Sequence, residues 1–195
     1  PYVKPSETCF FARVPAAALA VKGVSLFICA NFLVPPAPVE AAPARAVPYY
    51  ERAAATGLAD AQYAMAQVYA NGVGGKTRDD GKARSLLAQA ARQNYDTAQI
   101  DLAAWMIEGR GGVRDLKSGF NWMKQAAEGG NVAAQNRLAK LYMGGIGTDP
   151  DLILAGAWYV VARRAGLIDP EMDDFLQGLT DDQTKQALQK ANRLP

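Results

Sequence analysis

The chain contains 195 residues, and half of them are hydrophobic, so it is long enough to bury the core of one domain of ordinary size. It carries 21 lysine and arginine residues against 19 aspartate and glutamate residues, a net charge of +2. This balance argues against a nucleic-acid-binding protein held by a strong basic field. The chain has no histidine, which excludes a Ser-His-Asp triad, a Cys-His pair and a histidine-ligated zinc site within it.

Residues 1–44 differ in composition from the rest of the chain. A positively charged lead precedes a largely apolar run over 14–34, and Ala42-Pro43-Ala44 has the small-x-small form of a cleavage site. This order predicts a secretory signal peptide and therefore a periplasmic protein. Two alternatives stay open, because the apolar run is just long enough for an uncleaved membrane anchor and could also form a packed helix. Lys22, near the middle of the run, counts against the anchor.

From about residue 45 the sequence repeats itself. The Ala61-Gln62 pair recurs as Ala98-Gln99 and as Ala134-Gln135, at spacings of 37 and 36 residues. Glycines stand at the eleventh and thirteenth positions after each of these alanines: Gly72, Gly109 and Gly145, and then Gly74, Gly111 and Gly147. Registered positions of this kind in three successive units predict a repeat architecture.

Each unit is predicted to form a helix hairpin. The apolar residues of the first unit follow the stripe of an amphipathic helix: Ala61, Met65, Val68 and Tyr69. Asp60 is the expected N-cap, Asn71-Gly72 the expected end, and a second helix is expected over 80–92.

The same layout extends the helices along the chain. It predicts helices over 97–108 and 116–128, then over 133–143 and 151–165, after a half-unit that starts at Pro48. A single hairpin cannot bury its own apolar face, whereas stacked hairpins can. The sequence therefore predicts an all-α protein, a right-handed α/α solenoid with about three and a half repeats over 45–166.

Residues 167–195 are predicted to form a C-terminal helical cap. Thr180 and Gln183 fit a capping box that opens a helix over 181–192. Ala187, Leu188 and Ala191 of that helix are expected to pack on the last hairpin and cover its open edge. The acidic residues at 169–174 are interpreted as acids in the first turn of a short helix after Pro170, rather than as a metal site.

Two patterns are compatible with a chemical role, and each also has a structural interpretation. Gly75-Lys76-Thr77 ends a loose phosphate-loop pattern, but such a loop needs a strand before it, and an amphipathic helix is expected here. Asp101 and Glu108 lie two turns apart on one predicted helix, a spacing that a two-carboxylate hydrolase could use. Solvent-facing helix acids are far commoner. We therefore expect no catalytic residue, no metal site and no cofactor.

The repeated motifs resemble a known family. Asp60-Ala61-Gln62-Tyr63 and Ala126-Ala127-Glu128-Gly129-Gly130 look like the Sel-one-like repeat, a relative of the tetratricopeptide repeat. This resemblance implies a protein-binding scaffold. With the predicted export signal, Ala157-Trp158-Tyr159-Val160 and Arg163-Arg164-Ala165-Gly166-Leu167 further resemble the ExoR family of periplasmic regulators. That resemblance implies that the protein binds the periplasmic part of a sensor histidine kinase and holds the kinase inactive. Exopolysaccharide synthesis and motility would be controlled in this way.

The predicted binding surface is a concave face made mostly by the first helix of each hairpin. Its candidate residues lie off the apolar stripe: Gln67, Asn71, Asp101, Arg137, Lys140 and Met143. The expected partner is a protein and not a nucleic acid, with membrane contact only through residues 1–44 if they stay attached. Two alternatives remain: a structural subunit of a membrane-associated assembly and a carboxylate-based carbohydrate-processing enzyme.

Overall fold

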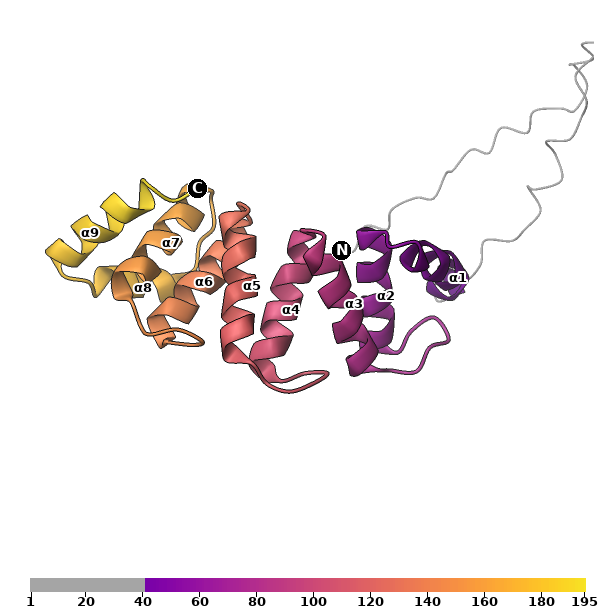
Figure 1. The fold of residues 1–195 in the computed structure, drawn as a ribbon. Helices are drawn as coiled ribbons and strands as arrows, with labels where there is room; N and C mark the ends of the chain where they lie inside the picture. Colours follow the sequence, from indigo (N-terminus) through magenta and orange to yellow (C-terminus); the bar gives the residue numbers. More distant parts are fainter. Residues whose placement is uncertain (1–40) are drawn as a thin grey trace, which may run out of the picture. The chain divides into compact units, whose positions relative to one another are not determined.

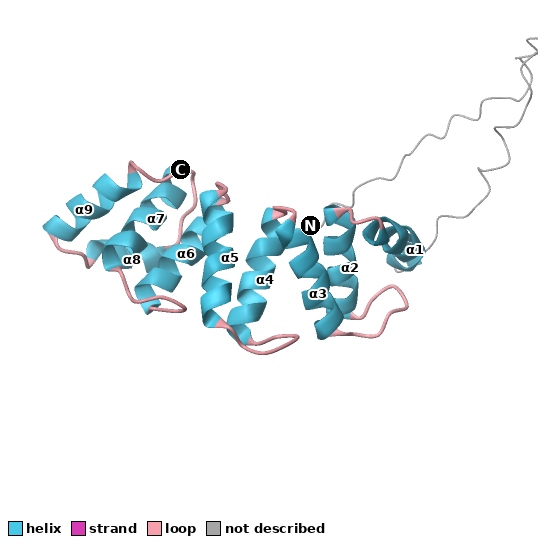
Figure 2. Cartoon of the chain, viewed as in Figure 1, coloured by secondary structure: helices cyan, strands magenta, loops and turns pink. Residues whose placement is uncertain are grey.

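The computed structural model describes residues 41–195, which contain nine helices and no strand (Figure 2). The helices are α1 (Ala41–Ala55), α2 (Ala59–Asn71), α3 (Asp80–Arg92), α4 (Asp96–Glu108), α5 (Leu116–Glu128), α6 (Val132–Gly144), α7 (Leu152–Arg164), α8 (Pro170–Gln177) and α9 (Asp181–Ala191). The predicted signal peptide over 1–44 lies outside the described residues, except for its last four, which begin α1. Within the described part, no helix combines the length and apolar character needed to cross a bilayer.

The helices stack as hairpins in chain order. Each helix from α1 to α7 packs against the next one along the chain, and α9 returns to pack along α7 (Figure 1). The three full hairpins are α2–α3, α4–α5 and α6–α7, and α8 with α9 closes the C-terminal end. The expected all-α solenoid of stacked hairpins with a C-terminal cap is confirmed. Pro48, however, lies inside α1 rather than in its first turn, so that prediction was wrong.

The second helix of each hairpin begins at an aspartate that recurs every 36 residues: Asp79, Asp115 and Asp151. Each side chain accepts hydrogen bonds from backbone N–H groups of the first turn, which would otherwise have no partner. The first helices use this device less: α2 begins at Ala59 after Leu58, with no side-chain cap. Asp60 is therefore not the N-cap, and instead places its charge in the first turn, where the helix dipole favours an acid.

Glycine permits the close approach of neighbouring hairpins. A Cβ at Gly111 would lie 2.2 Å from the carbonyl oxygen of Asp80, and one at Gly147 would lie 2.2 Å from that of Leu116. Both glycines have positive φ angles, 69° and 76°. The loop of each later hairpin thus lies on the first turn of the preceding second helix, at a distance that no side chain permits.

The core is rich in alanine and crossed by buried glutamines. Ala83, Ala90, Ala98 and Ala134 are fully buried, which lets the helices pack closely. Gln99 Nε2 donates a hydrogen bond to the carbonyl oxygen of Ala91 at 3.1 Å, and Gln135 Nε2 donates to that of Ala127 at 3.4 Å. These carbonyls lie in the last turns of the preceding second helices, where each also accepts a hydrogen bond from a backbone N–H of the following turn, that of Asn94 or of Gly130, at 3.0 Å. Gln99 and Gln135 therefore fasten α4 to α3 and α6 to α5, whereas Gln62 of α2 hydrogen-bonds to Gln89 and Gln93 at the end of the following helix, α3.

The C-terminal cap forms largely as predicted. Thr180 and Gln183 make the expected capping box at the start of α9, and Ala187 and Ala191 are buried against the stack. Leu188 does not pack as expected, because it is 42% exposed and lines an open hollow. Asp169 caps the N-terminus of α8, which confirms that the acids at 169–174 belong to a helix start.

Candidate protein-binding face

The first helices α2, α4 and α6, followed by the start of α8, form one side of the stack, which we call the first-helix face. Neighbouring elements on this face meet at three places. We name them the N-terminal junction (α2 with α4), the middle junction (α4 with α6) and the C-terminal junction (α6 with α8). Four of the six candidate binding residues lie at these junctions, so the contacts there decide which side chains a partner can use.

At the N-terminal junction, two side chains of α2 hold one carboxylate of α4, and we call such a contact between neighbouring elements a side-chain clamp. Asp101 Oδ2 accepts hydrogen bonds from Tyr63 Oη at 3.0 Å and from Gln67 Nε2 at 3.1 Å. The ring of Tyr63 also lies 5.2 Å from that of Tyr95. Burial, and secondarily the negative charge of Asp101, raise the pKa of Tyr63 to about 12. Gln67 and Asp101 are thus engaged in stacking the first two hairpins.

At the C-terminal junction, the clamp is ionic. Asn136 Nδ2 donates to Asp169 Oδ2 at 2.8 Å, and Lys140 Nζ lies 2.8 Å from Asp169 and 2.6 Å from Glu171. Hydrogen bonds from Lys140 and Asn136 lower the pKa of Asp169 to about 2, and the same carboxylates raise the pKa of Lys140. Lys140 therefore ties α6 to the cap.

The middle junction lacks such a clamp along its helices. The positions that Tyr63 and Gln67 occupy in the first hairpin are taken in the second by Ile100 and Ala104, whose side chains cannot hydrogen-bond. Arg137, at the position equivalent to Asp101, is exposed and makes no ion pair or hydrogen bond among residues 41–195.

A polar contact does exist at the turn end of the middle junction. There Asn131 Nδ2 donates to Asp96 Oδ2 at 2.6 Å, which lowers the pKa of Asp96. This contact holds the starts of α4 and α6 together, and it does not engage Arg137. The first-helix face thus presents an available guanidinium between two occupied junctions.

The two other candidate residues differ in exposure. Asn71 is exposed at the end of α2, where its Nδ2 donates to the backbone oxygen of Gln67 at 2.9 Å. Met143 is half-buried and packs against the core cluster that the second and third hairpins share with α8. Contact of any of the six residues with a partner stays a prediction.

The residues considered for catalysis do not come together as a site. Asp101 is occupied by Tyr63 and Gln67, and Glu108 is exposed at the end of the same helix. Lys76 follows a helix rather than a strand and pairs with Glu51 at 2.6 Å. Among the described residues, no three histidine, cysteine or acidic side chains gather in a way that could hold a metal ion.

Sequence reasoning missed one charged group at the hairpin loops. The Arg110 guanidinium lies 3.9 Å from the ring centroid of Trp105 and 2.9 Å from Asp80, and Arg78 pairs with the same carboxylate. The two arginines hold the pKa of Asp80 well below its usual range. Arg110 thus joins the loop of the second hairpin to the first turn of α3. No repeat signal marks it, because the equivalent residues are Val73 and Ile146.

The sequence of this chain is similar to those of known repeat proteins. The model of the Sel1 repeat family matches residues 37–58, 59–95, 97–131 and 132–167, which is more than half of the chain. Chitin synthase regulatory factor 3 of Schizosaccharomyces pombe is 28% identical over 148 residues, covering 75% of this chain. The chain spans only 16% of that relative's length.

Solved structures show the same architecture. A Sel1 repeat protein from Oxalobacter formigenes is 31% identical, with a TM-score of 0.60, over 69% of this chain and 99% of its own. A protective antigen of uropathogenic Escherichia coli with an SLR fold is 23% identical, with a TM-score of 0.56, over 76% and 40% of the two chains. The second likeness concerns the fold alone. Together with the family match, the stacked hairpins and repeated Ala-Gln pairs establish that the chain belongs to the Sel1 repeat family.

Proposed function

We propose that this chain is an exported repeat scaffold that binds and restrains a protein of the cell envelope. The observation that carries the proposal is the contrast between Arg137 and its neighbours on the first-helix face. Asp101 and Lys140 are held by residues of the stack, whereas Arg137 is exposed and unpaired among the described side chains. A cation presented on a preorganised face suits an acidic segment of a partner.

The proposed class of partner rests on the composition of residues 1–44 and on similarity to known proteins. The composition of residues 1–44 favours export, and the resemblance to the ExoR family favours the periplasmic domain of a sensor histidine kinase. The matched fungal relative is named as a regulatory factor, which supports regulation through binding rather than through catalysis. We propose exopolysaccharide and motility control as the output on the ExoR resemblance alone.

The proposal is tested by affinity purification of the full chain from envelope extracts. Three forms are compared: the natural chain, Arg137→Glu, and Arg92→Glu as a matched reversal on an exposed second-helix residue. We expect the natural chain and Arg92→Glu to recover the same envelope protein, and Arg137→Glu to lose most of it. Equal recovery with both variants would contradict a binding role for the first-helix face.

Export is tested separately. Fractionation and intact-mass measurement of the chain produced in its own host should give a periplasmic protein that lacks the N-terminal segment. A protein of full length in the membrane fraction would instead support the assembly-subunit alternative.

A further inference from the structure

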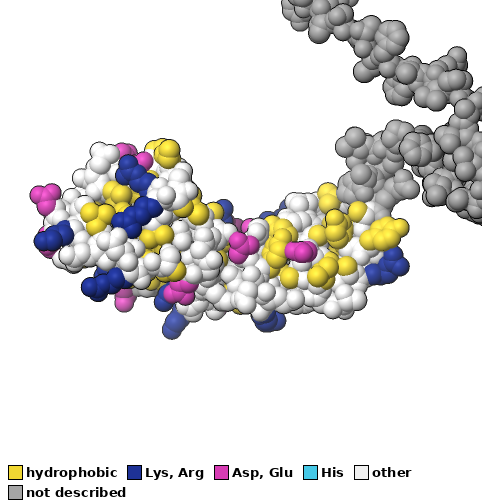
Figure 3. Space-filling model, turned by 90° about the horizontal axis from the view of Figure 1, so that it is seen from above, with side chains coloured by type: hydrophobic (Ala, Val, Ile, Leu, Met, Phe, Trp, Pro, Cys, Tyr) yellow, Lys and Arg dark blue, Asp and Glu magenta, His cyan; other side chains and the backbone are white. Residues whose placement is uncertain are grey.

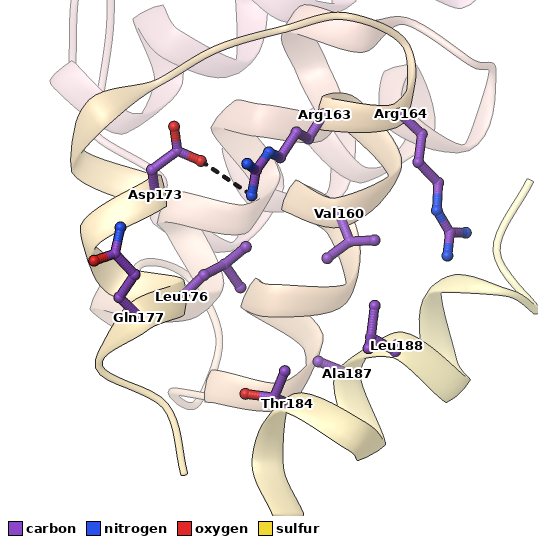
Figure 4. A pocket seen from close by; sticks show the side chains of 9 residues that line it. All are labelled: Val160, Arg163, Arg164, Asp173, Leu176, Gln177, Thr184, Ala187 and Leu188. Carbon is purple, nitrogen blue, oxygen red and sulfur yellow. Dashed lines mark ion pairs between the residues drawn. The ribbon is translucent and has the colours of Figure 1, made fainter. Parts of the chain in front are cut away.

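The C-terminal cap contains a hollow that the first-helix face does not use. It has a volume of about 560 Å³ and lies between α7, α8 and α9 (Figure 4). The hollow arises because α9 packs closely along α7, whereas α8 meets α7 at only a few points. Gly156 of α7 permits the close packing of α9, since a Cβ at this position would lie only 3.1 Å from the Cβ of Ala187. This volume is in the range of sites that hold a small ligand or a few side chains.

The floor of the hollow is apolar. Val160 and Leu176 line it from α7 and α8, and Leu188 lines it from α9. Leu188 is 42% exposed, whereas Ala187, which also lines the hollow from α9, is buried. An exposed leucine within an apolar hollow leaves hydrophobic area that a ligand could cover.

The rim is positively charged. Arg163 and Arg164 end α7, and Figure 4 shows both side chains beside the hollow. Arg163 lies 3.5 Å from Asp173, whose carboxylate also accepts a hydrogen bond from Tyr159 at 2.7 Å. Arg164 makes no ion pair or hydrogen bond within the part of the chain that the structure describes. The space-filling view in Figure 3 shows Lys and Arg side chains next to apolar side chains over the C-terminal helices.

The polar groups around the hollow favour a polypeptide. Gln177 and Thr184 add an amide and a hydroxyl group to the lining. Such groups can pair with a peptide backbone, whereas a hydrocarbon chain would leave them without a partner. Arginine at a helix C-terminus is favourable in itself, but the helix dipole does not account for the apolar hollow beside it.

We infer that this hollow binds a short polypeptide segment of a partner protein in which apolar and acidic residues alternate. The apolar side chains lie on Val160, Leu176 and Leu188, and a carboxylate pairs with Arg164. This site is separate from the first-helix face, so it does not depend on the function proposed above.

The test uses the full chain and a labelled hexapeptide of alternating leucine and glutamate, followed by fluorescence anisotropy. We expect Arg164→Glu and Leu188→Asp each to weaken binding about tenfold or more, Arg164→Lys to keep most of it, and Arg193→Glu to leave it unchanged. A peptide with lysine in place of glutamate should not bind. Thermal unfolding of each variant shows that the fold persists.

Four results would overturn the inference. One is no binding of the leucine–glutamate peptide at millimolar concentration. Another is equal binding by the natural chain and Arg164→Glu. A third is that oleate displaces the peptide, binds more tightly than the peptide and needs Arg164 for binding, which would assign the hollow to a fatty acid. The last is a loss of binding in Arg137→Glu alone, which would place the peptide on the first-helix face instead.

Discussion

The N-terminal and middle junctions share a backbone design and differ in their side chains. Beside both junctions a loop glycine approaches the preceding second helix equally closely, Gly111 at the start of α3 and Gly147 at the start of α5. Along the helices, however, Asp101 is held by two side chains of α2, whereas Arg137 has no such partner on the equivalent positions of α4. The repeat therefore stacks through its backbone and its buried glutamines, and its surface positions are free to differ.

This difference separates residues that build the stack from residues that can serve a partner. A polar side chain on a repeat surface is usually assigned to binding, yet Gln67, Asp101 and Lys140 each contact a neighbouring element. Arg137 does not. The comparison predicts that substitutions along the same face divide into those that cost stability and those that cost binding.

The largest expected effect comes from the loop glycines. Gly111→Ala and Gly147→Ala should each lower the free energy of unfolding by about 3 kcal/mol or more, because the new Cβ meets a backbone oxygen and the φ angle is positive. Gly75→Ala is the matched control, with positive φ and open space, and should cost about 1 kcal/mol. Urea unfolding measures all three, and a Gly147 cost far below that of Gly111 would show that the junctions differ in backbone packing.

The buried glutamines are next in size. Gln99→Leu and Gln135→Leu should each cost about 2 kcal/mol, because the carbonyls of Ala91 and Ala127 would each lose a buried amide donor and keep only a backbone N–H of the turn. Gln189→Leu, at an exposed site of α9, should change stability by less than about 0.5 kcal/mol. Thermal denaturation compares them. Equal effects at all three positions would mean that the glutamines do not fasten the hairpins.

The side-chain clamp should matter less. Asp101→Ala should lower stability by about 1–2 kcal/mol, since Tyr63 and Gln67 lose their common acceptor. Arg137→Ala should change it by less than about 0.5 kcal/mol, as expected for an exposed residue without contacts. A double-mutant cycle with Tyr63→Phe isolates the clamp. A cost at Arg137 as large as at Asp101 would remove the distinction between the two junctions.

The smallest effect is the acid dependence of the C-terminal junction. The pKa of Asp169 is about 2 in the folded chain, below the usual value near 4. The stabilisation is therefore complete above about pH 4 and is lost as the pH falls toward about 2. Asp169→Asn should show a smaller loss of stability over this interval than the natural chain, as measured by chemical denaturation at each pH. Parallel curves would contradict the ionic clamp.

Much of the fold was predictable because the repeat signal is strong. Registered alanines and glycines indicated the hairpins, and the ends of α3 and α5 agree with the expected ranges. Asp79, Asp115 and Asp151 carry an equally regular signal for the second-helix caps, which the sequence reasoning did not use. The position of Asp60 misled because an acid in the first turn and an acid at the N-cap look alike in a sequence.

The binding face was harder to predict. Residues lying off the apolar stripe of their own helix can still be engaged by the next hairpin, as Asp101 and Lys140 are. Such contacts depend on how hairpins stack, which one unit's periodicity does not encode. The hollow beside Leu188 was missed for a similar reason, because its walls come from three helices.

The most direct test of the binding face is photocrosslinking in the native host. A photoreactive phenylalanine derivative replaces Ala133, an exposed residue one turn before Arg137 on α6, or Lys124 on α5 as the control. The account predicts one envelope protein crosslinked from position 133, lost when Arg137→Glu is added, and no such adduct from position 124. An equal adduct from both positions, or one that survives Arg137→Glu, would contradict it.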